Sequence, residues 1–239
     1  MERKEFLKRL GFSTLMTPAF MRCQEDSVEP TVDNTADGTT STDDGTCTIS
    51  PTETAGPFPT HDPSSLVIEK ITSDRTGVPL SVKLTIQDLN NGCEPLANVL
   101  VDIWHCDKDG YYSEYGGSGM QAANLTAYHF LRGRQTTNSD GQVGFVSIFP
   151  GWYSGRAPHI HVHIFDSTGK SLLITQIAFP TSVCDVVYTT ATQYYTKGKQ
   201  DTSNAGDNIF ADSIDREMGT VTGSVDGGYS LTHRIVVKS

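Results

Sequence analysis

Short runs in which apolar and polar residues alternate, separated by turn-forming residues, make up most of the chain from Thr48 onward. Residues 81–86 alternate with the period of two that is typical of a half-buried strand, and residues 98–104 form the apolar run of a fully buried strand. Residues 144–149 follow the turn pair Asp140-Gly141. Further strands are predicted at 159–165, 172–179, 219–225 and 229–237.

Strands of this length and spacing, with Gly, Pro and Asn between them, predict an all-β fold, an antiparallel β-sandwich with long loops. Helical patterns are confined to two short stretches, near residues 122–127 and 185–196. The chain of 239 residues is 36% hydrophobic and 19% charged, which is enough for one good core and hardly for two. We therefore expect a single folded domain over residues 47–239.

The first 46 residues differ in composition from the rest. Residues 1–22 combine a basic head with a short, weakly apolar body, a pattern typical of an export signal. Residues 23–46 are rich in Asp and Thr, contain no Lys, Arg or aromatic residue, and cannot bury enough apolar surface to fold. The sequence thus predicts an export signal, a disordered acidic linker and an exported protein, periplasmic or on the cell surface.

The cysteines bear on the predicted export. A lipid on Cys23 would be the tether of a lipoprotein to a membrane, whereas an unmodified cysteine fits the sequence equally well. Cys47, Cys93, Cys106 and Cys184 remain, an even number that predicts two disulfides in an exported chain. Of the three connectivities we favour Cys93 with Cys106 and Cys47 with Cys184; in a protein that stays in the cytosol, all four would be free and buried.

Charge and hydropathy exclude several classes of partner. The formal net charge is −10, which disfavours nucleic acid and anionic lipid surfaces. No stretch approaches the roughly eighteen apolar residues of a membrane span. The sequence has no internal repeat and no glycine-rich phosphate loop.

Four side chains carry the candidate chemistry: Tyr112, Tyr153, His159 and His161. Histidine is the commonest neutral metal ligand, whereas a phenol of pKa about 10 becomes a good ligand only beside a strongly Lewis-acidic ion. Two phenolates would cancel two of the three charges of Fe(III) and leave a weakly cationic site that still attracts an anionic ligand. The set therefore predicts ferric iron as the cofactor.

Strand geometry supports this grouping and also leaves an alternative. Alternation places His159 and His161 on one face, about 7 Å apart along the strand. His163 shares that face, so the stretch also fits a three-histidine zinc site in a zinc-dependent hydrolase, although no partnering glutamate lies near these histidines. A non-catalytic β-sandwich surface module is a third interpretation.

The residues just before Tyr112 resemble the start of a calcium-binding loop. Asp107-Lys108-Asp109-Gly110 lacks the further oxygen ligands and the closing glutamate that such a loop needs. We interpret it as a tight turn that directs Tyr112 inward.

Three segments of the chain, residues 96–112, 131–141 and 149–161, resemble the intradiol ring-cleavage dioxygenases, the family of catechol and protocatechuate 3,4-dioxygenases. The motif Tyr153-x-x-Arg156-x-x-His159-x-His161 is the most specific part, and the likeness runs from about residue 52 to 237. The resemblance implies non-haem Fe(III) held by Tyr112, Tyr153, His159 and His161.

The resemblance also implies roles for residues around the metal. Tyr153 would leave the metal when substrate binds, Arg156 would lie over the substrate ring, and Gln176 would complete the catalytic set. Arg156 and Gln176 are also expected to bind substrate, with Gly56 and Pro57 lining the pocket. The implied reaction inserts both atoms of O2 into a catechol-type aromatic diol and gives a cis,cis-muconate-type diacid. A homo-oligomer is left open.

Overall fold

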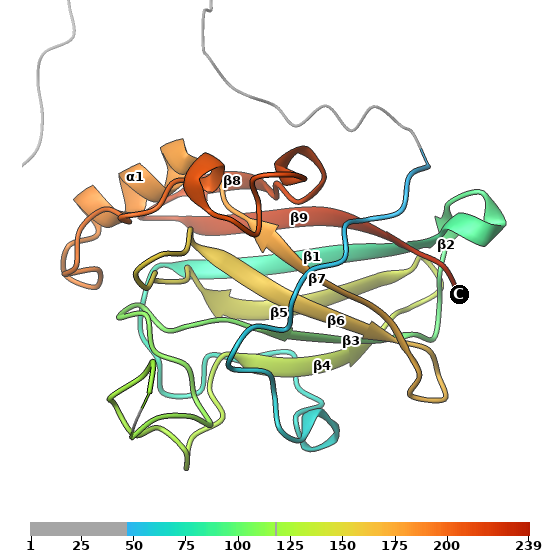
Figure 1. The fold of residues 1–239 in the computed structure, drawn as a ribbon, viewed down its shortest axis with the longest axis horizontal. Helices are drawn as coiled ribbons and strands as arrows, with labels where there is room; N and C mark the ends of the chain where they lie inside the picture. The colour runs from blue at the N-terminus through green and yellow to red at the C-terminus, as the bar shows by residue number, and fades with distance from the viewer. Residues whose placement is uncertain (1–46, 118) are drawn as a thin grey trace, which may run out of the picture. The chain divides into compact units, whose positions relative to one another are not determined.

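Two β-sheets packed face to face form the domain (Figure 1). The structure is a computed structural model that describes residues 47–117 and 119–239. One sheet has the order β2-β1-β9-β8 with β5 also paired to β1, and the other has the order β4-β3-β6-β7. The first sheet comprises β1 (Pro79–Asp88), β2 (Glu94–Pro95), β5 (Gln142–Ile148), β8 (Thr220–Ser224) and β9 (Gly228–Val237); the second comprises β3 (Leu100–Trp104), β4 (Arg132–Thr136), β6 (His159–Phe165) and β7 (Ser171–Ala178).

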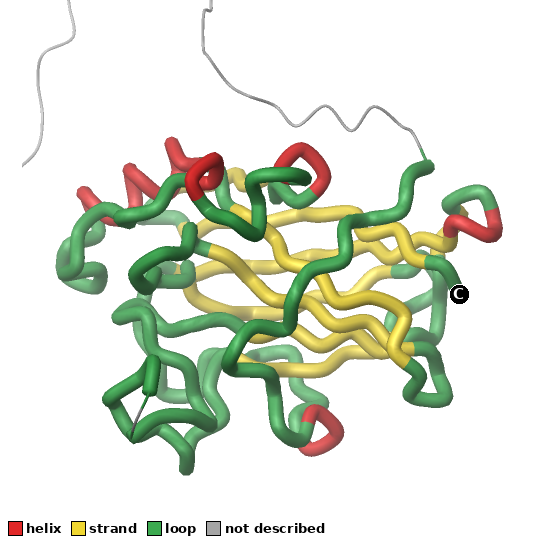
Figure 2. Tube along the Cα trace, viewed as in Figure 1, coloured by secondary structure: helices red, strands yellow, loops and turns green. Residues whose placement is uncertain are grey.

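Helices are few and short (Figure 2). The single α-helix of the described residues, α1 (Thr181–Thr190), buries Cys184, Val187 and Tyr188. The remaining helical turns are the 3-10 segments η1 (Pro63–Ser65), η2 (Leu89–Asn91), η3 (Asn204–Gly206) and η4 (Ile214–Arg216).

Alternate residues of the strands build the core between the sheets. Val82 and Leu84 of β1 and Ile160 and Val162 of β6 are fully buried. Burial of each such side chain contributes about 1.5–3 kcal/mol, so the period of two fixes which face of each strand points inward. The opposite face of β6 then carries His159 and His161, outside the main core.

An extended stretch of residues 50–60, which we call the covering segment, runs across that outer face (Figure 1). Its start is tied to β9 by Ser50, whose backbone N donates to Val236 O at 3.0 Å. In the middle, Glu53 N donates to Ile174 O of β7 at 2.8 Å. Near its end, the carbonyl oxygen of Phe58 accepts from Arg132 Nη1 at 3.0 Å. His159 and His161 are therefore enclosed even though they lie outside the sandwich.

The predicted fold class is confirmed, with one difference in pairing. Each predicted strand is present, and the boundaries of β6 agree with those predicted from the sequence. All nine strands of the described residues pair in antiparallel fashion at one edge or both, as expected, but β1 and β9 run parallel to each other. The short strands β2 and β4 were not predicted.

The charged sequence of β4 explains why it shows no strand pattern. Arg132 and Arg134 occupy the outward face of β4. Gly133 takes the inward position because a Cβ there would lie 2.5 Å from the Cγ2 of Ile71. A strand whose inward residue has no side chain carries no hydrophobic periodicity.

Both helix predictions need correction. Residues 122–127 form turns, because Leu125 N donates to Tyr115 O across the loop at 2.9 Å and not along a helix. The predicted helix at 185–196 is instead α1, which begins earlier, at Thr181 after Pro180. Pro180 is the N-cap residue, and its carbonyl oxygen accepts from Val183 N and Cys184 N, the first hydrogen bonds of the helix.

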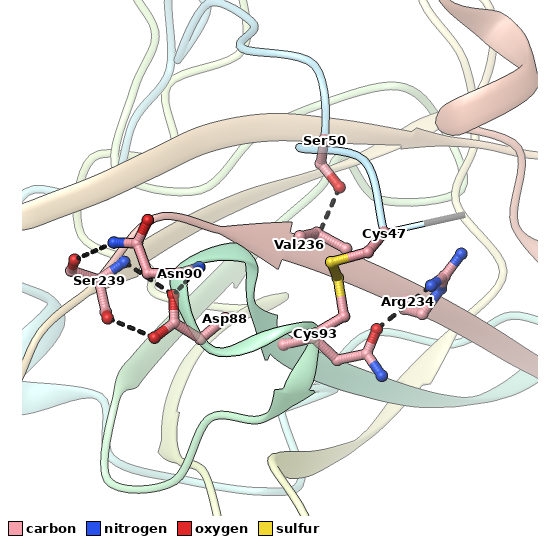
Figure 3. Close-up of a disulfide and its surroundings, with 9 residues drawn as sticks. Cys47, Ser50, Asp88, Asn90, Cys93, Arg234, Val236 and Ser239 are labelled. Atoms are coloured by element: carbon pink, nitrogen blue, oxygen red, sulfur yellow. Dashed lines mark hydrogen bonds between the residues drawn. A yellow bond between two sulfur atoms is a disulfide. The ribbon is translucent and has the colours of Figure 1, made fainter. Parts of the chain in front are cut away.

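The predicted disulfides are wrong. Cys47 bonds to Cys93 (Figure 3). Cys106 and Cys184 are buried free thiols. Cys93 lies at the turn after η2, whereas β3 carries the chain roughly 17 Å away before Cys106, at about 3.3 Å per residue. Cys106 consequently packs beside Trp104 and Tyr112, and Cys184 lies in the main core.

Residues 1–46, on which the predicted export signal, the acidic linker and Cys23 fall, lie outside the described residues. Within the described residues no helix has the length and apolar character needed to cross a membrane. The predictions about the first 46 residues therefore stay predictions.

The disulfide is expected to stabilise the domain because it closes a loop of 46 residues. Chain-entropy arguments assign such a bridge about 4 kcal/mol. The double variant C47S/C93S should unfold at a lower denaturant concentration than the parent. Adding reductant should lower the stability of the parent to that of the variant and leave the variant unchanged. Equal stability of the oxidised parent and the variant would contradict the prediction.

Candidate active site

A row of four side chains crosses the outer face of the four-stranded sheet. The strand register pairs Trp104 with Arg132 on one side and with His161 on the other, and His161 with Gln176. Residues directly opposite one another in a sheet point to the same face, so the four side chains lie side by side. The indole of Trp104 stacks on the imidazole of His161, with centroids 4.9 Å apart and planes 1° from parallel. The ring of His161 is thereby fixed.

His159 lies two residues earlier on the same face and points its ring at that of His161. The two Nε2 atoms are 3.1 Å apart. His159 Nδ1 is 2.6 Å from the carbonyl oxygen of Ala157, which can only accept, so Nδ1 carries the proton and Nε2 presents a lone pair. Among the described residues His161 Nδ1 is buried with no hydrogen-bond partner. An incompletely satisfied buried histidine is typical of a functional site.

Tyr112 completes one side of this pair from the loop after β3. Its hydroxyl lies 3.3 Å from His159 Nε2, and its ring, fully buried, stacks on Phe58 of the covering segment. The side chain of Gln121 fixes the backbone, since its Oε1 accepts from Tyr112 N at 2.7 Å and its Nε2 donates to Tyr112 O at 2.8 Å. Tyr112 is therefore held from both sides.

The turn that leads to Tyr112 has the geometry predicted for it. Asp107 Oδ1 accepts from the backbone N of both Asp109 and Tyr111 at 3.0 Å, and Gly110 has φ +89°, a region that favours glycine. The carboxylate thus satisfies its own backbone, and the interpretation as a tight turn is confirmed.

Tyr153 lies on the loop before β6, close to Tyr112 and His159. Its ring centroid is 5.8 Å from that of Tyr112 and 5.7 Å from that of His159, both edge to face. Tyr153 is only partly buried, unlike the other three residues. The four residues predicted as metal ligands thus come together in one place.

Burial sets the protonation of these groups. It lowers the pKa of His159 to about 3 and that of His161 well below its usual range, with the positive charge of Arg156 adding to both shifts. Burial also raises the pKa of Tyr112 well above 10 and raises that of Tyr153, an effect that Arg156 opposes. The imidazoles are therefore neutral, and the phenols ionise here only beside a strong cation.

This donor set fits a ferric ion. Two neutral imidazole nitrogens and two phenol oxygens converge, and a trivalent ion supplies the charge needed to displace both phenolic protons. A site of this kind holds a net single positive charge after both phenols ionise. A softer or less charged ion would leave the buried phenols protonated.

His163 does not join the cluster. Its Nε2 is 2.8 Å from Ser171 Oγ, and its ring stacks on Phe165 with centroids 3.8 Å apart. In residues 47–117 and 119–239, no three His, Cys, Asp or Glu side chains are arranged to share one metal ion. The three-histidine site that a zinc hydrolase would need is therefore not formed by these side chains.

Arg156 and Gln176 lie beside the centre and contact each other. Arg156 Nη2 donates to Gln176 Oε1 at 2.6 Å, and Gln176 Nε2 donates to Thr54 O of the covering segment at 2.9 Å. Arg156 Nε is held by the buried carboxylate of Asp207, 3.0 Å from Oδ1 and 2.9 Å from Oδ2. Arg156 and Gln176 are therefore joined by hydrogen bonds to each other and, through Gln176, to the covering segment.

Gly56 and Pro57 were predicted to line the pocket. Gly56 has φ +68°, and a Cβ on it would meet His161 Cε1 at 3.0 Å, so it contacts a predicted ligand directly. Pro57 is exposed. The absence of a side chain at position 56 makes room for the imidazole.

A cavity of about 170 Å³ connects Tyr153 with the surface. The aromatic rings of Phe58, Tyr111 and Tyr153 give it a largely apolar wall, and Lys197 is its basic residue. Its lining is completed by Asp109, Gly110, Met120 and Gln121. Tyr153 is the one predicted site residue among these lining residues, so the cavity reaches the centre at Tyr153.

Several residues that hold the site were missed in the sequence. Arg132, Gln121 and Asp207 each contact a segment that carries a predicted site residue, but they lie 19, 9 and 51 residues from the groups that they hold. Asp207 follows a glycine in a turn-like stretch, Gly206-Asp207-Asn208, where a carboxylate that bonds to backbone is common. That signal predicts a turn and says nothing of the partner.

Comparison with known proteins agrees with this geometry. The family model described as Dioxygenase matches residues 56–215, a range that contains all the side chains of the site. The structure titled "Intradiol ring-cleavage Dioxygenase from Tetranychus urticae" is similar with a TM-score of 0.71 at 28% identity, covering 80% of this chain and 95% of that one. The chain belongs to the intradiol dioxygenase family.

Two curated relatives match this family member over shorter regions. The protocatechuate 3,4-dioxygenase beta chain of Burkholderia cepacia is 30% identical over 115 residues, 44% of this chain and 48% of the relative. The chlorocatechol 1,2-dioxygenase of Rhodococcus opacus is 28% identical over 142 residues, 52% of this chain and 51% of the relative. The chain thus spans about half the length of the curated relatives it matches.

The contact between Gly56 and His161 generates a prediction. Gly56→Ala should push the imidazole out of place and reduce the iron retained per chain, measured by elemental analysis after loading with Fe(III). The matched control is Gly92→Ala, since Gly92 has φ +64° but no atom within 4 Å of a Cβ. Both variants should lose about 1–2 kcal/mol of stability from backbone strain, and only Gly56→Ala should lose iron. Equal iron content in the two variants would show that the close contact does not matter.

Proposed function

We propose that this family member is an Fe(III)-dependent intradiol dioxygenase that inserts both atoms of O2 into a catechol-type aromatic diol. The product would be a cis,cis-muconate-type diacid. One observation carries the proposal: Tyr112, Tyr153, His159 and His161 converge beside Arg156 in a largely buried centre. The names of the curated relatives, a protocatechuate and a chlorocatechol dioxygenase, support a catechol-type substrate.

Bound ferric iron would supply a Lewis-acidic centre that withdraws electron density from a catecholate and so activates its ring toward O2. His159 and His161 would hold it through their Nε2 atoms, and Tyr112 and Tyr153 through their phenol oxygens. Stacking on Trp104 and on Phe58 would keep His161 and Tyr112 in place.

The chain's own residues offer a route for the substrate protons. Tyr153 lines the cavity and is the least buried of the four candidate ligands, so an incoming diol would meet it first. Its phenol oxygen can take a proton from the substrate hydroxyl as it leaves its position in the centre. Tyr112, buried and hydrogen-bonded at its backbone, would stay.

Arg156 would stabilise the negative charge that develops on the substrate ring. Its guanidinium is planar and positively charged, so it can lie against a flat aromatic anion. Gln176 would fix the direction of this side chain through the 2.6 Å hydrogen bond to Nη2.

The proposal extends to setting and assembly. We propose an exported protein, periplasmic or at the cell surface, for which the Cys47–Cys93 disulfide is supporting evidence because such bonds persist in oxidising compartments. A lipid on Cys23 and a homo-oligomer are expectations that direct mass measurement and light scattering would test.

The proposed ligand set predicts that iron binding depends on His161 and not on His163. His161→Ala should lose bound iron, the visible absorption band that phenolates give with Fe(III), and O2 uptake with catechol. His163→Ala is the matched control on the same strand face, and it should keep all three because His163 contacts Ser171. Iron loss in both variants would favour a three-histidine site, and a colourless parent that takes up no iron would contradict the proposed function.

The role of Arg156 gives a separate expectation. Arg156→Ala should keep the iron and the visible band while turnover falls about 10²–10³-fold, the usual loss on removing one preorganised group that stabilises charge. Stopped-flow measurement of catechol binding and oxygen-electrode measurement of turnover would separate the two steps. Turnover at the parental rate would refute the role.

A further inference from the structure

We propose that Asp207 is a positioning residue that fixes the direction of the Arg156 guanidinium over the substrate site. The inference rests on the proposed function and adds to it a residue outside the predicted catalytic set. Asp207 lies directly after η3, in a loop far along the chain from the centre, and its side chain is fully buried.

Every acceptor position of the Asp207 carboxylate is used on the Arg156 side or in its own loop. Both oxygens lie within 3.0 Å of Arg156 Nε. Oδ2 also accepts from the backbone N of Ala157 at 2.7 Å, and Oδ1 accepts from Ile209 N at 2.9 Å. The Asp207 carboxylate therefore holds the Arg156 side chain, the backbone of Ala157 and, through Ile209, the backbone of its own loop.

The edge at which the guanidinium is held decides what remains for substrate. A carboxylate that grips both Nη atoms would occupy the outer fork of an arginine, the edge that usually binds anions. Asp207 instead takes Nε, and Nη2 turns to Gln176. Nη1 is outside these hydrogen bonds, so one edge of the charged group stays available to the site.

The same loop also supplies an aromatic neighbour. The ring of Phe210, fully buried, lies 5.6 Å from the Arg156 Cζ and 6.3 Å from the His159 ring centroid. Phe210 N donates to Asp207 O at 3.1 Å, so the two side chains are set by one turn. Asp207 and Phe210 together restrict the guanidinium from two directions.

Asp201 provides a matched control. It contacts the loop that carries Arg156, accepting from Ser154 Oγ at 2.6 Å and from Gly155 N at 3.3 Å. Its bonds are exposed, and they do not involve the guanidinium. Loss of Asp201 tests whether any carboxylate that anchors this loop matters for turnover.

The experiment compares Asp207→Asn and Asp201→Asn in the full-length, iron-loaded protein with catechol and O2. We expect Asp207→Asn to lower kcat about 10- to 100-fold, since a misplacement of 1 Å can cost that much, with KM, iron content and the visible band close to the parent. Asp201→Asn should stay within about twofold. Parental kcat in Asp207→Asn would overturn the inference; an inactive parent would instead refute the proposed function.

A double-variant cycle separates positioning from structural support. If Asp207 acts through Arg156, Asp207→Asn should lower kcat no further in an Arg156→Ala background. An equal additional loss in that background would overturn the inference, because it would mean that Asp207 supports the fold and not the arginine.

A measurement on the metal-free parent protein keeps the inference testable where a variant fails to fold. The Nε–H proton of Arg156, buried against a carboxylate, should exchange with solvent at least about tenfold more slowly than those of exposed arginines, because exchange requires local opening of the buried contact. Nitrogen-15 NMR of the arginine side chains measures it. Exchange as rapid as at exposed arginines would overturn the inference.

Discussion

Two imidazole nitrogens that face each other at 3.1 Å inside a closed space impose the main constraint on this structure. When His159 Nδ1 donates to Ala157, its Nε2 is an acceptor, and a second acceptor at that distance is repelled unless a proton or a cation lies between them. The register of β6 creates the pair, since a shift by one residue would turn both histidines into the sandwich and Ile160 out of it. The core and the centre therefore depend on the same alternation.

Buried polar side chains hold the other donors against that pair. Arg132, nearly inaccessible to solvent, donates to Ser113 O at 2.6 Å and to Phe58 O at 3.0 Å, so it ties the residue after Tyr112 to the covering segment. Its charge is offset by Glu114, 3.6 Å away. A buried pair of this kind adds little net stability, because desolvation offsets attraction, but it leaves few alternative arrangements for the loop. The Arg132–Glu114 pair therefore contributes mainly to the geometry of the loop and little to its stability.

The sequence predicts most of what is periodic or local. The strands that line the core were found because Val, Ile and Leu alternate with polar residues, and the centre was found because three of its four donors lie within nine residues, from Tyr153 to His161. Features set by long-range contacts were not found. β4 has arginines on its outer face and a glycine on its inner face, and the Cys47–Cys93 bond depends on where β9 brings the start of the domain.

The supporting residues illustrate the same limit at the site. Nothing near Asp207 in the chain indicates an arginine 51 residues away, because a carboxylate in a turn usually bonds to its own backbone, as this one also does with Ile209. Gln121 is similar, since an amide between two loops has no periodic signature. Catalytic side chains can be recognised by their chemistry, whereas the residues that position them are known only once the loops are placed.

The two tyrosines show how environment separates the functions of identical side chains. Tyr112 is fully buried, stacked on Phe58 and fixed at its backbone by Gln121. Tyr153 is partly exposed, lines the cavity and lies on a loop whose next residues, Ser154 and Gly155, are exposed. Moving Tyr112 would break buried hydrogen bonds and open a void in the core, whereas moving Tyr153 would mainly rearrange a surface loop. For the proposed function, a centre that would keep a metal and still admit a diol gains from one donor of each kind, and this asymmetry supports Tyr153 as the proposed proton acceptor.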